Sequence, residues 1–171
     1  MLFRTIMIFP QFNNENIINA IRKKYDPLYN LVKPHITLVF PFQDKISNIE
    51  LEKKLEECFI EIPPFKIILQ GISRQKDNYG NYIFLNVKQG ERQIIDVHNN
   101  LYRNIWKKEQ DERYIPHMTL GKFQSEGEMM EAYKDVKDLD SSFETFVDKI
   151  SVEEIGKRGE SFVVIEKHLY K

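Results

Sequence analysis

Two of the four histidines in this chain are followed, two positions later, by one of its four threonines. They are His35, with Thr37, and His117, with Thr119, and each pair has Pro before it and Leu after it. Because successive side chains on a β-strand point to opposite faces, each pair would place an imidazole and a hydroxyl on one face. With threonine this scarce, two such pairs are poorly explained by chance.

In-line displacement at phosphorus is the chemistry that suits two imidazoles and two hydroxyls around one anion. One imidazole would take a proton from the attacking oxygen, and the other would donate a proton to the leaving oxygen. We therefore predict His35 and His117 as the catalytic pair, without deciding which is the acid. Thr37 and Thr119 are predicted to donate hydrogen bonds to the substrate phosphate.

The two motifs belong to an internal repeat that covers most of the chain. The segment PHITLVFPFQ at 34–43 aligns with PHMTLGKFQS at 116–125, and FKIILQGIS at 65–73 aligns with FETFVDKIS at 143–151. Each half would contain a strand, a helix, the motif strand, a helix and a strand. Such halves can be related by a pseudo-twofold axis, which would place the motif strands in two sheets facing each other across a groove.

Apolar spacing and turn residues predict the elements that position the motifs. The predicted helices cover 13–27, 48–60, 92–108 and 127–137. The predicted strands cover 2–10, 35–40, 65–73, 82–88, 117–123, 143–155 and 161–170. Strands and helices of this length indicate one α+β domain without a linker.

The paired motifs HITL and HMTL resemble those of the two-histidine (2H) phosphoesterase superfamily, in its 2′-5′ RNA ligase-like and cyclic phosphodiesterase group. The resemblance implies an α+β fold over residues 1–171, with two pseudo-symmetric lobes, each an antiparallel sheet flanked by helices. The active site would lie in the groove between them and need no metal or cofactor. The implied substrates are 2′,3′-cyclic phosphates or 2′-5′ linkages of RNA ends or small nucleotides.

One position departs from the pattern of many relatives, which carry Arg five residues after the second histidine. This chain has Lys122 there, which offers a point charge instead of a bidentate fork. Strict alternation would turn Lys122 away from the face that bears His117, but a β-bulge at Gly121 could bring it back. We predict Lys122 as a third phosphate-binding residue, with a solvated surface lysine as the alternative.

Aromatic rings near the motifs could stack on a nucleotide base, and Tyr114 and Phe42 are the candidates. Core packing is the alternative for each ring. The other two histidines, His98 and His168, lack a threonine two positions later and are predicted to be structural or exposed. Cys58 lies in an apolar helical segment and is predicted to be a buried core residue.

Other classes of function fit the sequence less well. A catalytic zinc site usually has three protein ligands, and no acidic residue or cysteine lies at ligand spacing near either motif. The chain has neither the G-x-S-x-G segment of many serine hydrolases nor a phosphate-binding P-loop. The main alternative is a catalytically weak protein of the same fold that binds RNA ends or nucleotides.

Charge and composition limit the partners of the protein. The 171 residues include 25 Lys and Arg against 26 Asp and Glu, which argues against binding long nucleic acid through bulk charge. No apolar segment approaches the length of about 18 residues that a membrane span needs. We therefore expect a cytoplasmic monomer that binds RNA ends or a small nucleotide.

Overall fold

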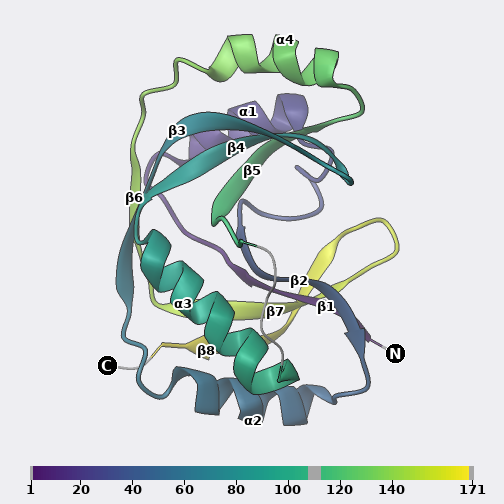
Figure 1. Cartoon of the computed structure of the whole chain (residues 1–171), viewed down its shortest axis with the longest axis vertical. Helices are drawn as coiled ribbons and strands as arrows, with labels where there is room; N and C mark the ends of the chain where they lie inside the picture. Colours follow the sequence, from purple (N-terminus) through teal and green to yellow (C-terminus); the bar gives the residue numbers. More distant parts are fainter. Residues whose placement is uncertain (1, 108–112, 170–171) are drawn as a thin grey trace.

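The structure is a computed structural model that describes residues 2–107 and 113–169 (Figure 1). Eight strands and four α-helices make up the described part. The strands are β1 (Leu2–Ile8), β2 (Ile36–Asp44), β3 (Phe65–Asp77), β4 (Gly80–Gln89), β5 (His117–Phe123), β6 (Phe143–Val147), β7 (Lys149–Ile155) and β8 (Ser161–His168). The helices are α1 (Glu15–Tyr25), α2 (Asn48–Phe59), α3 (Glu91–Leu101) and α4 (Glu126–Val136).

All eight strands form one antiparallel sheet in the order β6-β3-β4-β5-β2-β1-β7-β8. The predicted α+β class is confirmed. The prediction of a separate sheet for each half was wrong, because the motif strands β2 and β5 pair with each other through Ile36 and Met118. This pairing satisfies main-chain groups that two separate sheets would leave at exposed edges.

The helices cover the curled sheet in two groups (Figure 1). Helices α1 and α4 pack on the half formed by β3, β4 and β5, whereas α3 packs on β2 and α2 on β8. Helix α4 begins with a capping box between Ser125 and Glu128, and Ser47 caps α2. None of the helices in the described ranges is long and apolar enough to cross a membrane.

The predicted helix at 92–108 differs in its last turn. Helix α3 ends at Leu101 and continues as a π-helical turn, Tyr102–Trp106, while residue 108 lies outside the described residues. The π-helical turn shifts the phase of the side chains. As a result Trp106 contacts Phe42 edge to face, with 4.8 Å between the ring centroids.

The core lies between the helices and the apolar face of the motif strands. Ile36 and Leu38 of β2, and Met118 and Leu120 of β5, are each fully buried. Cys58 is also buried, which confirms its prediction as a core residue. Since alternate residues of the motif strands fill this core, the histidines and threonines between them must lie on the opposite face of the sheet.

Candidate active site

The motif side chains occupy one face of the centre of the sheet. His35, Thr37, His117 and Thr119 are each partly exposed, whereas the residues between them are buried. The alternation predicted for both motifs is therefore confirmed. The sheet thus presents two imidazoles and two hydroxyls on the face away from the core.

The register of the two motif strands determines how these four side chains lie relative to one another. Ile36 pairs with Met118 across antiparallel strands. A regular ladder continued one step to each side of this pair would have His35 opposite Thr119 and His117 opposite Thr37. Directly opposed residues lie about 4.5 to 5.5 Å apart and diagonal ones about 7 to 8 Å, so the two histidines would be diagonal neighbours. The charge of His117 lowers the pKa of His35, in keeping with this proximity. One phosphate group can contact both imidazoles at that spacing.

Both imidazoles are held by the same main-chain contact. Nδ1 of His35 lies 2.8 Å from the carbonyl oxygen of Lys33, and Nδ1 of His117 lies 2.7 Å from that of Ile115. Each carbonyl accepts the Nδ1 proton, which leaves Nε2 of the neutral ring as a proton acceptor. The intervening proline fixes the backbone and explains why each motif begins with Pro-His.

Burial lowers the pKa of both histidines. For His35 the carbonyl of Lys33 partly opposes this shift, Arg22 lowers the pKa while its partner Asp26 raises it, and His117 lowers it further. For His117 the carbonyl of Ile115 and the charge of Asp77 oppose the effect of burial. The neutral, proton-accepting form is therefore favoured in the empty site, and a bound phosphate anion would favour the imidazolium.

A β-bulge interrupts the second motif strand immediately after the His-Thr pair. Thr119 pairs with Phe84 and Gly121 with Ile83, so that Leu120 is the extra residue on β5. Both Leu120 and Gly121 are buried. A side chain at Gly121 would come within 2.8 Å of the Phe123 ring, so only glycine fits this approach.

The bulge brings Lys122 back to the face that bears His117. Lys122 pairs with Tyr82, two residues before Phe84 on the same face of β4, and Phe84 lies opposite Thr119. The Lys122 Nζ lies 5.4 Å from the centroid of the Tyr82 ring. The structure thus contains the β-bulge at Gly121 that the sequence suggested. The role of Lys122 in phosphate binding stays a prediction.

The first motif carries a bulge at the same place. Thr37 pairs with Met7 and Val39 with Ile6, so that Leu38 is the extra residue on β2. The position that corresponds to Lys122 is Phe40, which is 51% exposed. The two halves of the site therefore share their geometry but differ in charge, because only the His117 side carries a cation at this position.

Side chains bind the carbonyl oxygens of three consecutive residues at the bulge in β2. The donors are the Tyr114 hydroxyl to Thr37 (2.7 Å), His98 Nδ1 to Leu38 (2.6 Å) and the Thr5 hydroxyl to Val39 (2.7 Å). The rings of His98 and Tyr114 also stack, 3.8 Å apart and nearly parallel. This clamp holds the backbone of the first motif in its bulged form.

The structure does not bring Tyr114 and Phe42 as free stacking rings to the face that bears the motif histidines. One face of Tyr114 is covered by His98, and its burial raises its pKa. Phe42 packs against Trp106 on the core side. As predicted, His98 is structural: it belongs to the clamp. His168 is exposed at the end of the edge strand β8.

Two rings that the sequence did not single out lie beside the motif histidines. Phe84 stacks on His117 with 3.6 Å between the ring centroids. The ring centroids of Phe9 and His35 lie 6.1 Å apart. Both residues follow from the pairing of β4 with β5 and from the end of β1 beside β2. A strand register would have identified them, but the sequence pattern does not supply it.

No group of three or more His, Cys, Asp or Glu side chains within residues 2–107 and 113–169 is arranged to hold a metal ion. A reaction that needs no metal stays a prediction from the two motifs.

Tyr114→Phe removes the hydroxyl that binds the Thr37 carbonyl and leaves this acceptor without its side-chain donor. We expect the free energy of unfolding to fall by about 1 to 3 kcal/mol, the cost of an unsatisfied buried polar group. Urea denaturation of both proteins measures the change. Tyr79→Phe is the matched control, because Tyr79 is 83% exposed. Equal losses in both variants would contradict the clamp.

Comparison with known proteins, like the geometry of the site, indicates a phosphoesterase family. The profile of the 2′-5′ RNA ligase superfamily matches residues 9–158. A candidate phosphoesterase of Geobacillus thermodenitrificans is 30% identical over 145 residues, which cover 84% of this chain and 83% of the relative. A candidate phosphoesterase of Bacillus licheniformis is 28% identical over 152 residues, with 84% of this chain and 85% of the relative covered.

Solved structures share the fold. Escherichia coli LigT complexed with 3′-AMP superimposes with a TM-score of 0.66 at 18% identity, over 99% of each chain. The protein TT0787 of Thermus thermophilus has a TM-score of 0.62 at 14% identity, over 98% of each chain. At sequence identities this low, the similarity extends only to the fold, that is, to the arrangement of strands and helices.

Proposed function

The chain belongs to the 2′-5′ RNA ligase superfamily, and on this premise we propose that it is a metal-independent phosphoesterase in which His35 and His117 act as an acid/base pair. The proposed substrates are 2′,3′-cyclic phosphates or 2′-5′ linkages of RNA ends or small nucleotides. The observation that carries the proposal is the shared orientation of the two imidazoles, on one face and beside the two threonine hydroxyls.

The proposed reaction moves one proton across the phosphate. One imidazole accepts at Nε2 the proton of an attacking water or hydroxyl, whose oxygen forms the new bond to phosphorus. The other imidazole donates its proton to the ribose oxygen as the bond from that oxygen to phosphorus breaks. Thr37, Thr119 and Lys122 bind the non-bridging oxygens, where negative charge accumulates.

We propose further that residues 1–171 form one domain of two pseudo-symmetric lobes joined through the common sheet. Ile36 pairs with Met118, which is its counterpart in the other motif. Ile67 pairs with Thr145, its counterpart in the second pair of repeated segments. A residue that pairs with its own counterpart across antiparallel strands lies beside a local twofold axis, and the groove would follow this axis.

Nucleotides are the proposed substrate class because of both the site and the relatives. LigT structures of Escherichia coli exist with 3′-AMP, ATP and NADP+. In this chain the partly exposed rings of Phe84 and Tyr82 lie on the face that bears the motif side chains. Aromatic rings beside a phosphate site can stack on a base or ribose.

Turnover of a panel of small substrates tests the proposal. The panel contains 2′,3′-cyclic nucleotides, oligonucleotides with a cyclic phosphate end and 2′-5′ dinucleotides, each incubated with and without chelator. We expect cleavage of at least one class at a rate that the chelator leaves unchanged. Tight binding of these nucleotides without turnover would favour the alternative of a binding protein of the same fold.

The pH dependence of turnover should reflect the lowered pKa of both histidines. The active pair needs one neutral and one protonated imidazole, so kcat/KM should be bell-shaped, with apparent pKa values that belong to the pair. As the pH rises through the upper value, the remaining imidazolium is lost and the rate falls. Since burial lowers both pKa values, this limb should lie below about 6.5, the usual value for histidine.

The kcat profile should have its upper limb at higher pH, because a bound phosphate anion stabilises the imidazolium. Initial rates at saturating and limiting substrate measure the two profiles. A flat kcat/KM between about pH 5 and 8, with chemistry rate-limiting, would be inconsistent with a titrating histidine pair.

A further inference from the structure

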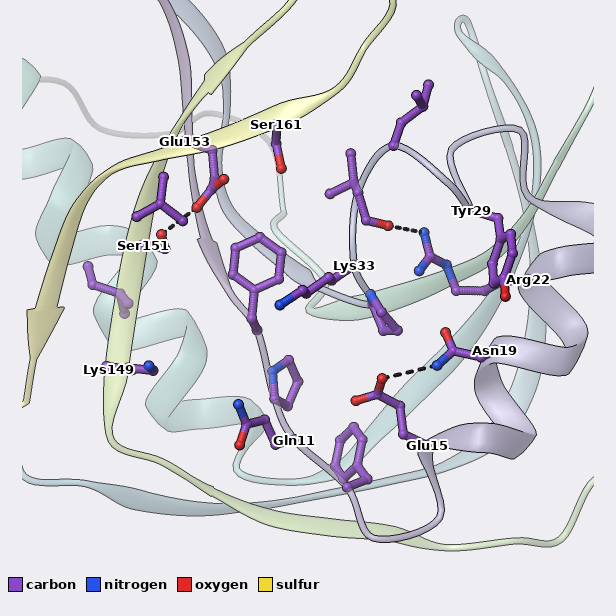
Figure 2. Close-up of a pocket in the computed structure, with 18 of the residues that line it drawn as sticks. Gln11, Glu15, Asn19, Arg22, Tyr29, Lys33, Lys149, Ser151, Glu153 and Ser161 are labelled. Atoms are coloured by element: carbon purple, nitrogen blue, oxygen red, sulfur yellow. Dashed lines mark hydrogen bonds between the residues drawn. The ribbon is translucent and has the colours of Figure 1, made fainter.

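A large cavity lies next to the first motif, and neither motif histidine lines it. Its volume is about 910 Å³, and α1, the segment 29–34 and strands β7 and β8 form its walls. Figure 2 shows polar side chains directed into it from several of these elements. Cavities that bind small molecules have volumes of about 300 to 1,000 Å³, so this one could hold a substantial part of a nucleotide.

The cavity continues the catalytic face on the side of His35. Phe9 lines the cavity and lies 6.1 Å from the His35 ring, and Lys33 and Pro34 precede His35 directly. On the sheet, Ser151 of the cavity wall pairs with Met7, which in turn pairs with Thr37. Since directly paired residues point to the same face, the cavity and the motif side chains share one side of the sheet.

A buried guanidinium with an unsatisfied nitrogen belongs to this wall. Arg22 is 1% exposed, its Nε donates to Asp26, and its Nη2 donates to the Val32 carbonyl. Its Nη1 has no hydrogen-bond partner among the described residues. In Figure 2 the Arg22 side chain extends from α1 toward the cavity. Buried polar groups in native proteins nearly always have a partner, so an acceptor is expected here when the site is occupied.

The other charged groups of the cavity are distributed unevenly. Lys33, on the same wall as Arg22, is exposed and makes no ion pair within the described part of the chain. On the far wall Lys149 is paired with Glu166, and Glu153 accepts a hydrogen bond from Ser151. The carboxylate Glu15 accepts one from Asn19. The available positive charge thus lies next to His35.

We infer that this cavity is a second anion subsite, in which Arg22 and Lys33 bind a phosphate group of the substrate other than the one that reacts. The inference rests on the proposed function and deepens it: the preferred substrate carries at least two phosphates, as an oligonucleotide end or a phosphorylated cyclic nucleotide does. A base carbonyl could accept from Arg22 alone. A phosphate, with at least two non-bridging oxygens and a negative charge, suits both side chains.

Equilibrium binding of two nucleotides that differ by one phosphate tests the subsite without requiring turnover. The probes are adenosine 3′-monophosphate and adenosine 3′,5′-bisphosphate, titrated calorimetrically at one ionic strength. We expect the bisphosphate to bind about tenfold or more tightly, as one charge-assisted hydrogen bond predicts. Equal affinities for the two probes would overturn the inference.

Variants assign the effect to the cavity. Lys33→Gln should lower the affinity ratio of the two probes severalfold, because the exposed side chain can be changed without disturbing a buried pair. Lys23→Gln is the matched control, since it removes the same charge from an exposed position on α1, and it should keep the ratio. Equal losses in both variants would mean that bulk charge causes the preference and would overturn the inference. Arg22→Gln is less informative, since it leaves Asp26 buried without its partner.

The outcomes separate this inference from the proposed function. If cyclic nucleotides are cleaved but a second phosphate does not improve binding, the proposed function stands and the subsite is refuted. If the bisphosphate is preferred through Lys33 but no substrate of the panel is cleaved, the subsite stands and the proposed catalytic function is refuted.

Discussion

Replacement of either motif histidine by alanine is expected to lower kcat by about 10² to 10⁴, the usual contribution of a positioned general acid or base. The expected loss is large because each imidazole would supply one of the two proton transfers of the displacement. Both side chains are only partly buried, and their Nδ1 contacts are to main-chain carbonyls. The variants should therefore fold with little change in thermal stability.

His168→Ala is the matched control for these variants, because His168 is exposed on β8 and far along the sheet order from β2 and β5. Its kcat should equal that of the wild type. Steady-state rates on a substrate that the wild type cleaves provide the comparison. A near-normal rate for both His35→Ala and His117→Ala would remove the basis for assigning catalysis to the pair.

The second largest effect is expected for the threonine hydroxyls. Thr37→Val and Thr119→Val keep the shape of the side chain but remove the donor to a non-bridging oxygen, which should cost about 10 to 10³ in kcat/KM. Part of the loss should appear in KM if the hydrogen bond already exists in the ground state. The expected cost is smaller than that of the histidines, because no proton is transferred.

Ser142→Ala provides the control for these substitutions. It removes a hydroxyl from an exposed position that directly precedes β6. Its replacement should leave kcat and KM unchanged. Variants with normal kcat/KM at both Thr37 and Thr119 would show that the hydroxyls do not contact the reacting phosphate.

The local features of the motif strands could be predicted from the sequence. Alternation along HITL and HMTL correctly predicted which side chains are buried, and the glycine in the second motif suggested the bulge that turns Lys122. Both inferences depend only on neighbours in the chain. The short-range rules of strand geometry are sufficient for them.

The pairing between distant strands could not be predicted from local patterns. Pairing of β2 with β5 joins segments that are distant in sequence, and its register is set by packing that no local pattern encodes. For this reason two sheets were predicted where the structure has one. The same limitation applies to Tyr114, whose stacking on His98 depends on the placement of α3 against β2.

The rate of the double variant His35→Ala/His117→Ala, compared with the two single variants, shows whether both histidines act on the same phosphate. Two residues that serve one displacement at one phosphate act as a unit, so the double variant should be scarcely slower than the slower single variant. The measurement needs kcat of the four proteins on one cleaved substrate in the presence of chelator. A double variant whose loss equals the product of the two single losses would mean that the histidines act independently and would rule out a shared acid/base role.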